Sequence, residues 1–322
     1  MTRPPRQNSG FYPPPFRAAP RVDTLSPMIR VGVAGWSYPD WEGIVYPASK
    51  AVGFDRLSYL ACYFDTLEIN TSFYRIPDPA RVASWAQRVR GHPGFRFTVK
   101  LYQGFTHRRE DLRPGDEGAF HAVLDPLRDA DRLGAVLIQF PYSFRPTPRC
   151  RETMEAIFET FRGYPLVVEV RHQAWAKDEF FQFLRSREVG FCNLDQPGVA
   201  HSLGPTEAVT SRIGYVRLHG RNARDWFRRE AGPSARYDYL YAEEELSPWA
   251  DRIRRVAEQT ADSFIIANNH FRGKAPLAAL TLLSMLLDRR VAAPPGLVAA
   301  YPEISPRVIP PPPPAQGRLF GD

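Results

Sequence analysis

Side chains that can transfer protons recur at the ends of short apolar runs in this sequence. The carboxylates and the imidazole in such positions belong to Glu68, Glu169, Asp195 and His219. Histidine titrates near neutral pH and a carboxylate can act as a general base, so these residues are candidates for general acid–base catalysis. Cations in equivalent positions could hold an anionic substrate, and they are Lys100, Arg171 and Arg221. Taken alone, Glu68 and Lys100 are better explained as a structural ion pair than as catalytic residues.

Neutral polar and aromatic side chains stand at the remaining run ends and could bind a substrate. They belong to Trp36, Tyr38, Asn70, Gln139, Asn268 and Asn269. The segment 35–43 (GWSYPDWEG) offers flat apolar faces with polar edges, which could form one wall of a ligand pocket or plug the end of a barrel. Shortly after Asn269, Gly273 opens a helix, and the N-terminus of that helix could receive a phosphate group.

Spacing within the runs places several of these groups on one face of a strand. Glu68 and Asn70 are two residues apart, as are Glu169 and Arg171, and alternate residues of a strand face the same side. The segment 217–221 (RLHGR) alternates arginine, histidine and arginine in the same way. A histidine between two arginines at a strand end is a stronger catalytic candidate than an isolated histidine.

A divalent metal is the cofactor that the four proton-transfer candidates could hold, because they offer an oxygen-rich ligand set with one imidazole. The three cations come from the same positions and would compete with a metal for the carboxylates. The chain also has no H-E-x-x-H or H-x-H spacing and no cysteine cluster. We therefore predict no metal site and no cofactor, with a divalent metal as the alternative. No G-x-G-x-x-G, P-loop or G-x-S-x-G motif supports a nucleotide cofactor or serine hydrolysis.

The runs that carry these groups alternate with helical segments. The eight runs are 29–36 (IRVGVAGW), 65–70 (DTLEIN), 95–100 (FRFTVK), 134–140 (GAVLIQF), 166–172 (LVVEVRH), 190–195 (GFCNLD), 215–221 (YVRLHGR) and 263–269 (SFIIANN). Buried strands that alternate with helices indicate a parallel α/β architecture. Eight such units in about 250 residues match a single (β/α)8 barrel, the TIM barrel. Catalytic groups in such barrels lie where the strands end, so we expect the candidates to converge on one mouth.

Helix boundaries in the sequence are marked by capping residues. Asp-Pro at 78–79, Thr-Pro at 147–148 and Ser-Pro at 247–248 each place a capping side chain before a proline at the first helical position. Further helical segments are expected at 54–63, 116–132, 177–188 and 274–288. Between residues 196 and 212 we predict no helix, so the sixth and seventh strands are expected to be joined by a loop or a short helix.

Two connections on the expected active face, 102–115 and 220–242, are long enough to act as lids or binding loops. The second contains five Arg, one Trp and three Tyr. Arginine with interleaved aromatic residues can stack on bases and hold phosphate. A solvated loop pinned by its aromatic residues explains the same composition.

Composition and charge restrict the class of protein. No window approaches the length of a membrane span, and the N-terminus lacks the continuous apolar segment of a secretory signal. Three scattered cysteines argue for a reducing compartment, so we expect a cytoplasmic protein. The net charge is +7, of which residues 1–27 contribute +3. A mildly basic body suits an anionic small molecule or a nucleic acid, although surface arginine explains it as well.

Two proline-rich flanks are set apart from the body of the chain. We expect a disordered arm at 1–27, the barrel at 28–290 and an extended or disordered tail at 291–322. The tail ends in the pattern Q-x-x-L-F, formed by Gln316, Leu319 and Phe320. This pattern resembles the short peptide by which bacterial DNA-processing proteins dock on the DNA sliding clamp, so the clamp is a candidate partner.

A combination of motifs carries a resemblance to a known family. The segments GWSYPDWEGIVYP, LEINTSFYRIP, FTVK, IQFP, VEVRHQAW, VRLHGR and NNHFRGKAPLAAL together resemble the YecE-like family, domain of unknown function 72, over roughly residues 30–288. The resemblance implies a TIM barrel and no settled reaction. Where relatives typically have F-N-N-D, this chain has Ala-Asn-Asn-His at 267–270, which removes an acid from the last position.

Two functions remain in view. The first is an enzyme, a hydrolase or lyase, that acts on a phosphorylated or nucleic-acid substrate by general acid–base chemistry at the barrel mouth. The second is a non-catalytic nucleic-acid-associated protein linked to DNA metabolism through its C-terminal peptide. Similarity of such barrels to the endonuclease IV and xylose isomerase group supports a DNA or sugar-phosphate substrate only by analogy of fold. No membrane partner is expected.

Overall fold

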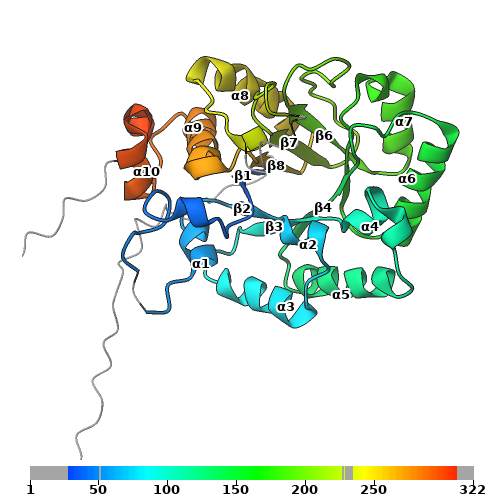
Figure 1. Cartoon of the computed structure of the whole chain (residues 1–322), viewed down its shortest axis with the longest axis horizontal. Helices are drawn as coiled ribbons and strands as arrows, with labels where there is room; N and C mark the ends of the chain where they lie inside the picture. Colours follow the sequence, from blue (N-terminus) through cyan, green and yellow to red (C-terminus); the bar gives the residue numbers. More distant parts are fainter. Residues whose placement is uncertain (1–27, 51, 227, 229–234, 310–322) are drawn as a thin grey trace, which may run out of the picture.

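The protein folds into a closed barrel of eight parallel strands (Figure 1). The computed structural model describes residues 28–50, 52–226, 228 and 235–309. Each strand pairs with the next along the chain, and β8 pairs with β1. The strands are β1 (Met28–Ala34), β2 (Thr66–Ile69), β3 (Arg96–Lys100), β4 (Leu133–Gln139), β5 (Leu166–Glu169), β6 (Gly190–Asp195), β7 (Ile213–Leu218) and β8 (Asp262–Ala267). The predicted TIM barrel is therefore confirmed.

Helices surround the barrel (Figure 1). The α-helices are α1 (Arg56–Ala61), α2 (Thr71–Tyr74), α3 (Pro79–Arg88), α4 (Gln103–Thr106), α5 (Asp116–Asp129), α6 (Pro148–Thr160), α7 (Asp178–Ser186), α8 (Glu243–Ala257), α9 (Lys274–Leu287) and α10 (Pro295–Ala300). The 3-10 helices are η1 (Pro39–Trp41), η2 (Arg109–Asp111), η3 (Gln173–Trp175), η4 (Ala235–Tyr237), η5 (Phe271–Gly273) and η6 (Pro302–Arg307). As predicted, the described connection between β6 and β7 holds no helix. None of the helices in the described ranges is long and apolar enough to cross a membrane.

Two of the three predicted helix starts are confirmed. The side chains of Asp78 and Thr147 cap α3 and α6 by accepting from backbone N–H groups at 2.8 and 3.2 Å. The start predicted at Ser-Pro 247–248 is wrong, because α8 begins at Glu243 and Pro248 lies inside it. Three consecutive glutamates favour the earlier start, since negative charge stabilises the first turn of a helix. The third of them, Glu245, accepts from the backbone N–H that precedes the helix at 3.0 Å.

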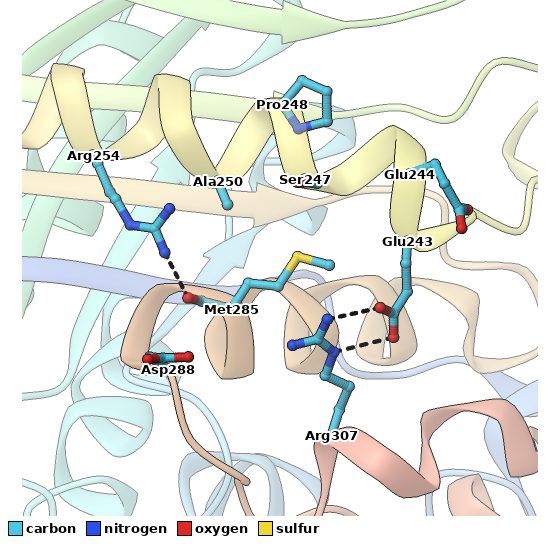
Figure 2. A pocket seen from close by; sticks show the side chains of 9 residues that line it. All are labelled: Glu243, Glu244, Ser247, Pro248, Ala250, Arg254, Met285, Asp288 and Arg307. Carbon is cyan, nitrogen blue, oxygen red and sulfur yellow. Dashed lines mark hydrogen bonds and ion pairs between the residues drawn. The ribbon is translucent and has the colours of Figure 1, made fainter.

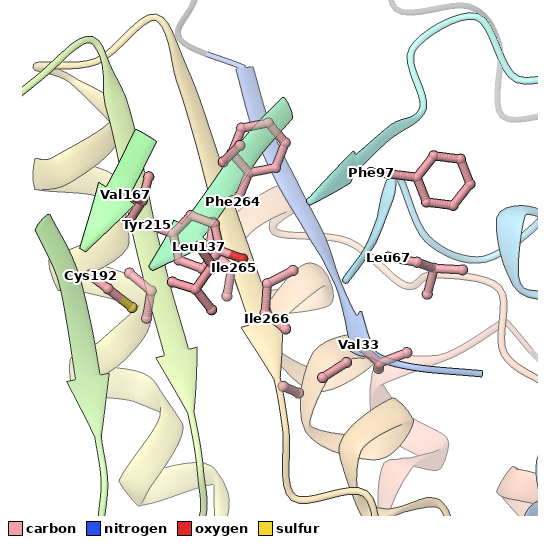
Figure 3. Packing of buried hydrophobic residues seen from close by; sticks show 14 of the residues in the cluster. Val33, Leu67, Phe97, Leu137, Val167, Cys192, Tyr215, Phe264, Ile265 and Ile266 are labelled. Atoms are coloured by element: carbon pink, nitrogen blue, oxygen red, sulfur yellow. The ribbon is translucent and has the colours of Figure 1, made fainter. Parts of the chain in front are cut away.

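Apolar and aromatic side chains fill the N-terminal part of the barrel interior. Leu137, Tyr215 and Phe264 come together between the strands (Figure 3). The Phe264 ring lies directly against the backbone of Gly134, where an added Cβ would stand 2.4 Å from it. Arg30 is buried beside them and bonds to Asp262 at 3.2 Å and to the carbonyl of Gly94. This end of the barrel is therefore packed with side chains.

The segment 291–309 folds against α8 and α9 and extends the barrel domain past the predicted boundary at residue 290. Leu297, Ile304 and Val308 are buried. Arg307 donates to Glu243 of α8 at 3.1 and 2.7 Å, as Figure 2 shows. The extended conformation expected for 291–322 is wrong for this part, because its apolar residues repay the ordering of the chain. The expected N-terminal arm and the Q-x-x-L-F peptide lie outside the described residues.

Candidate active site at the barrel mouth

A buried ion-pair network centred on Arg217 crosses the barrel near the C-terminal ends of the strands. Arg217 donates from Nη2 to Glu68 Oε1 at 2.7 Å and from Nη1 to Glu169 Oε2 at 2.5 Å. The three side chains are at most 1% exposed. Their charges stabilise one another, because an unpaired charge at this depth would be strongly destabilising. Arg217 is absent from the candidates named above, although its alternation with His219 on one strand face is the signal that points to it.

Tyr215 supports the network from below. Its hydroxyl donates to Glu68 Oε2 at 3.0 Å and lies 2.9 Å from Thr98 Oγ1. Burial and the neighbouring Glu68 carboxylate raise the pKa of Tyr215 well above its ordinary value, so the hydroxyl keeps its proton. Both oxygens of Glu68 therefore have partners, and its carboxylate is held in one orientation.

His219 and Arg171 complete the network on its outer side. Arg171 Nε donates to Glu169 Oε1 at 3.0 Å, and His219 Nε2 lies 3.3 Å from the same oxygen. Asn268 Nδ2 lies 3.0 Å from His219 Nδ1. Burial, followed by the charge of Arg171, lowers the pKa of His219 to about 3. The imidazole is therefore neutral at physiological pH, with Nδ1 accepting from Asn268 and Nε2 donating to Glu169.

The Glu169 carboxylate is held in its ionised form. Burial alone would raise its pKa, but the charges of Arg217 and Arg171 outweigh burial and hold the pKa well below its usual value. A carboxylate with such a low pKa is a weak base near neutral pH. Glu169 is consequently better placed to orient the two guanidinium groups than to remove a proton from a substrate.

Lys100 does not pair with Glu68, contrary to the prediction, because Arg217 holds that carboxylate. Its Nζ lies 3.8 Å from the centre of the Phe73 ring. Within the described ranges no ion pair or hydrogen bond to this ammonium group is found, and the residue is 8% exposed. Burial and the charge of Arg217 lower the pKa of Lys100 to about 7, against an opposing effect of the two glutamates. Lys100 therefore titrates close to neutral pH.

His107 and Gln139 lie in the same corner of the mouth as Phe73. His107 Nδ1 is 2.8 Å from Thr106 Oγ1, and its Nε2 is 3.5 Å from Gln139 Nε2. The His107 and Phe73 rings are nearly perpendicular, with their centres 4.9 Å apart. Burial, followed by the charge of Lys100, lowers the pKa of His107 to about 4. The long connection after β3 thus contributes a neutral histidine to the mouth.

Asp195 and Arg221 lie at the same end of the barrel but form a separate cluster. Arg221 Nε donates to both oxygens of Asp195 at 3.1 and 3.0 Å, and its Nη1 donates to Glu245 of α8 at 3.0 Å. Tyr241 donates to Asp195 at 2.5 Å. Asp195 pairs in register with Leu218, whereas Leu194 pairs with the inward-facing Arg217, so Asp195 faces the helices. Two carboxylates therefore already neutralise the charge of Arg221.

The aromatic side chains of the segment after β1 lie in two different places. Tyr38 stacks on His270 with ring centres 4.3 Å apart, and Tyr237 of the β7–α8 connection packs on His270 at 4.8 Å. Trp36 instead packs against Trp85 of α3 at 5.2 Å, in the helical layer. Of the two predicted binding residues in this segment, only Tyr38 lies at the mouth.

Several buried polar atoms around the mouth have no hydrogen-bond partner within the described part of the chain. They are Oδ1 of Asn70, Asn268 and Asn269, Nδ1 of His270, and Nε of Arg236. Leaving such an atom unsatisfied costs about 1–3 kcal/mol, so a cluster of them requires an explanation. Most of these atoms are acceptors, which suits a ligand that carries hydroxyl groups.

Trp226 of the long β7–α8 connection covers the network. It is buried, and its ring lies 5.5 Å from the guanidinium carbon of Arg171 and 6.1 Å from the His219 ring. A tryptophan face above a guanidinium is a favourable cation–π arrangement. The connection that was predicted to be a lid or a binding loop thus supplies a side chain directly above the ion pairs.

Two surface hollows lie away from this network. The first, of about 520 Å³, is bordered by α8, α9 and Arg307 (Figure 2). The second, of about 690 Å³, lies beside Trp36, between α1 and the end of α3. Neither includes a residue of the ion-pair network. The chemistry is therefore concentrated where the mouth is filled with side chains, and a ligand would have to displace some of them.

The N-terminus of α9, where a phosphate site was considered, is covered by apolar groups. Gly273 has a φ of +80°, and an added Cβ would lie 3.0 to 3.2 Å from Val45, Ile44 and Leu297. Lys274, the first residue of α9, forms an ion pair with Asp238. The geometry does not favour a phosphate at this corner of the barrel.

The candidate carboxylates have guanidinium partners instead of a metal-binding arrangement. Arg217, Arg171 and Arg221 take up oxygens of all three acids. Within the described ranges, no three His, Cys, Asp or Glu side chains are grouped so that they could hold a metal ion. The candidate site therefore consists of charged and polar side chains that pair with one another.

These features define a TIM-barrel protein with a buried, arginine-bridged polar network at the C-terminal mouth. A family model described as protein of unknown function DUF72 matches residues 30–300. The chain belongs to this family.

Relatives and solved structures agree with this assignment. UPF0759 protein YunF of Bacillus subtilis (strain 168) is 28% identical over 278 residues, which are 80% of this chain and 95% of that protein. UPF0759 protein YecE of Escherichia coli (strain K12) is 31% identical over 193 residues, which are 56% of this chain and 64% of that protein. A crystal structure of a DUF72 family protein from Thermotoga maritima MSB8 is 33% identical, with a TM-score of 0.70, and the match covers 81% of this chain and 99% of that chain. The family thus extends over nearly the whole barrel.

Proposed function

We propose that this protein is an enzyme that acts on a small phosphate-containing compound at the barrel mouth, with Lys100 as the group that transfers protons near neutral pH. The observation that carries the proposal is the position of Lys100. It is a buried ammonium group without a carboxylate partner in the described part of the chain. A strongly shifted ionisable group beside specific charge partners is a candidate functional residue.

A charge balance of the network supports an anionic ligand. Arg217 and Arg171 together match the two buried carboxylates of Glu68 and Glu169. Lys100 adds a further positive charge whenever it is protonated. An unpaired charge in a buried place is costly, so an anion that reaches the mouth gains by neutralising it.

The remaining candidates receive different roles in this proposal. Glu68 and Glu169 orient the guanidinium groups. Neutral His219 orients Asn268, whose unpartnered Oδ1 can accept a hydrogen bond from the substrate. Arg171 binds the anion together with Lys100. Asp195 and Arg221, proposed from the sequence as a base and an anion clamp, hold each other outside the network and are left out of the chemistry.

A non-catalytic nucleic-acid protein is the alternative. Burial favours the small substrate, because Trp226 covers Arg171 and the network side chains are inaccessible to a duplex. A nucleic-acid protein would bind the phosphate backbone through exposed cations, with affinity that falls steeply with salt. That interaction would not depend on Lys100.

Isothermal titration calorimetry with inorganic phosphate tests the proposal. We expect binding at pH 6.5 that weakens on the order of tenfold or more in Lys100→Met, equivalent to the loss of one charged hydrogen bond. Lys177→Met is the matched control, since Lys177 is exposed, and it should bind phosphate as the wild type does. Turnover is then sought with phosphorylated sugars and phosphoesters, and again with Lys100→Met.

Two results would overturn the proposal. One is equal phosphate affinity in Lys100→Met and wild type. The other is the absence of phosphate binding together with tight binding of a single-stranded oligonucleotide by both proteins, which would favour the nucleic-acid alternative.

A further inference from the structure

Lys100 differs from every other lysine of the chain. Lysine occupies only four of the 42 basic positions, and arginine occupies the rest. Lys50 and Lys274 form ion pairs with Glu42 and Asp238, and Lys177 is exposed on the surface. Lys100 alone among these four is buried and has no carboxylate partner in the described residues. A chain that uses arginine almost everywhere has lysine at this position.

The backbone and neighbours of Lys100 fix its place at the end of β3. Ser72 Oγ donates to the Lys100 carbonyl at 2.6 Å, and the Phe73 ring lies against the ammonium group at 3.8 Å. These contacts come from α2, directly after β2. The amine is thereby held in a buried place, and burial favours the neutral amine over the charged ammonium.

An unused hydrogen-bond acceptor stands at the end of the strand next to Lys100. Ile69 of β2 pairs with Val99 of β3, so Asn70 and Lys100 are neighbours at the ends of adjacent strands. Asn70 Oδ1 is buried and has no partner within the described ranges. The mouth therefore brings together a nucleophilic atom and an acceptor for a hydroxyl group.

We propose that the substrate carries an aldehyde or ketone group as well as its phosphate, and that Lys100 Nζ forms an imine with the carbonyl carbon. This inference rests on the proposed function, since it specifies the substrate of the same site. It makes Lys100 a catalytic residue and assigns the reaction to lyase chemistry on phosphorylated carbonyl compounds.

The step is balanced without a further reactant. The lone pair of the neutral amine attacks the carbonyl carbon, the C–N bond forms, and the π electrons of the carbonyl move to oxygen. A proton passes from nitrogen to that oxygen and gives a carbinolamine, whose hydroxyl can donate a hydrogen bond to Asn70 Oδ1. A second proton, taken from solvent, converts this hydroxyl to water, which leaves as the nitrogen lone pair forms the C=N bond. The nitrogen keeps its remaining proton, so the product is a protonated imine. The protonated imine accepts the electron pair of the bond between the α and β carbons, and that is the bond that a lyase of this kind cleaves.

The protonation state agrees with this role. A lysine with a pKa of about 7 has roughly half of its amine in the reactive neutral form at pH 7. An ordinary lysine with a pKa near 10.4 has about one part in 2,500 in that form. Arginine remains charged at every accessible pH, so it could bind the phosphate at position 100 but could not form the imine.

Reductive trapping of the full-length protein tests the inference. The protein is incubated at pH 7 with glyceraldehyde 3-phosphate and sodium cyanoborohydride, which reduces an imine to a stable secondary amine. Peptide mass spectrometry then locates the adduct among the four lysines. We expect labelling of Lys100 on the order of tenfold or more above that of Lys177. Glyceraldehyde, which lacks the phosphate, should label Lys100 far less, and inorganic phosphate should protect it.

Two variants separate imine formation from phosphate binding. Lys100→Arg keeps the charge, so it should bind inorganic phosphate and give no adduct at position 100. Lys177→Arg should keep both properties. If the wild type binds phosphate but Lys100 is not labelled preferentially, the imine is wrong and the proposed function stands. Equal labelling of Lys100 by glyceraldehyde and its phosphate would overturn the assigned substrate class. Failure of both labelling and phosphate binding would overturn both proposals.

Discussion

Glu68 and Glu169 are held by a single guanidinium group, although two strands separate β2 from β5 around the barrel. Arg217 of β7 thereby ties three strands together across the interior. Because each carboxylate is fully buried, the geometry of one acid is coupled to that of the other through Arg217. Removing the bridge should therefore affect stability as well as the site.

Arg217→Met is expected to lower the free energy of unfolding by about 3–5 kcal/mol, because it leaves two buried carboxylates without their shared partner. Urea unfolding followed by circular dichroism measures the change. Arg90→Met, at an exposed arginine, serves as the control and should change stability little. Adding Glu68→Gln to Arg217→Met should restore part of the loss, and the absence of any recovery would contradict the electrostatic explanation.

Lys100→Met should change the pH dependence of stability. The pKa of Lys100 is about 7 in the folded protein and near 10.5 in the unfolded chain, so the unfolded chain binds more protons between these values. Stability of the wild type therefore gains from rising pH across this window and is reduced by Lys100 below it. At pH 6.5 the variant should be more stable by about 4–5 kcal/mol. Unfolding midpoints from pH 6.5 to 9.5 test this, and an unchanged slope in the variant would contradict the shift.

Tyr241→Phe tests whether the Asp195–Arg221 cluster is independent of the ion-pair network around Arg217. The hydroxyl donates to Asp195 at 2.5 Å and accepts from the Gly220 backbone at 2.9 Å. Its loss should destabilise the protein by about 1–3 kcal/mol, because the buried Gly220 N–H loses its acceptor and Asp195 keeps only its bonds to Arg221. Phosphate affinity should stay at the wild-type value by calorimetry. A tenfold weaker affinity would place Asp195 and Arg221 in the binding site after all.

The C-terminal peptide yields a prediction about a partner. If Leu319 and Phe320 bind the DNA sliding clamp, the full chain should bind it with an affinity of roughly tens of micromolar, in the range of a weak peptide anchor. Leu319→Ala with Phe320→Ala should abolish binding in the same titration, because burial of both apolar side chains drives it. No binding by the intact chain would remove this link to DNA metabolism.

The strands and their order could be predicted from the sequence because buried parallel strands are continuous apolar runs. The run 134–140 corresponds to β4 in this way, and 215–221 contains the end of β7. Helix starts were predictable where a side chain makes the cap, as at Asp78. At α8 the first-turn glutamates lie before the Ser-Pro pair, so the search for a capping side chain before a proline gives the wrong start.

The partners of the charged groups were harder to predict. Adjacent strand ends suggest Lys100 for Glu68, but the interior is narrow enough for Arg217 to reach across it. Whether a strand-end residue points into the barrel or toward the helices also depends on register, since a shift of one residue turns its side chain to the opposite face of the sheet. Asp195 illustrates this, because it faces the helices while Glu169 faces the interior.

The packing of Phe264 against Gly134, with Arg30 beside it, closes the N-terminal end of the barrel. As far as the described residues show, a compound bound at the network can enter and leave only through the mouth. Incoming substrate and outgoing product would then use the same passage and exclude one another. For an enzyme of this shape, accumulated product should inhibit competitively, and any side chain that narrows the mouth should slow entry and release together.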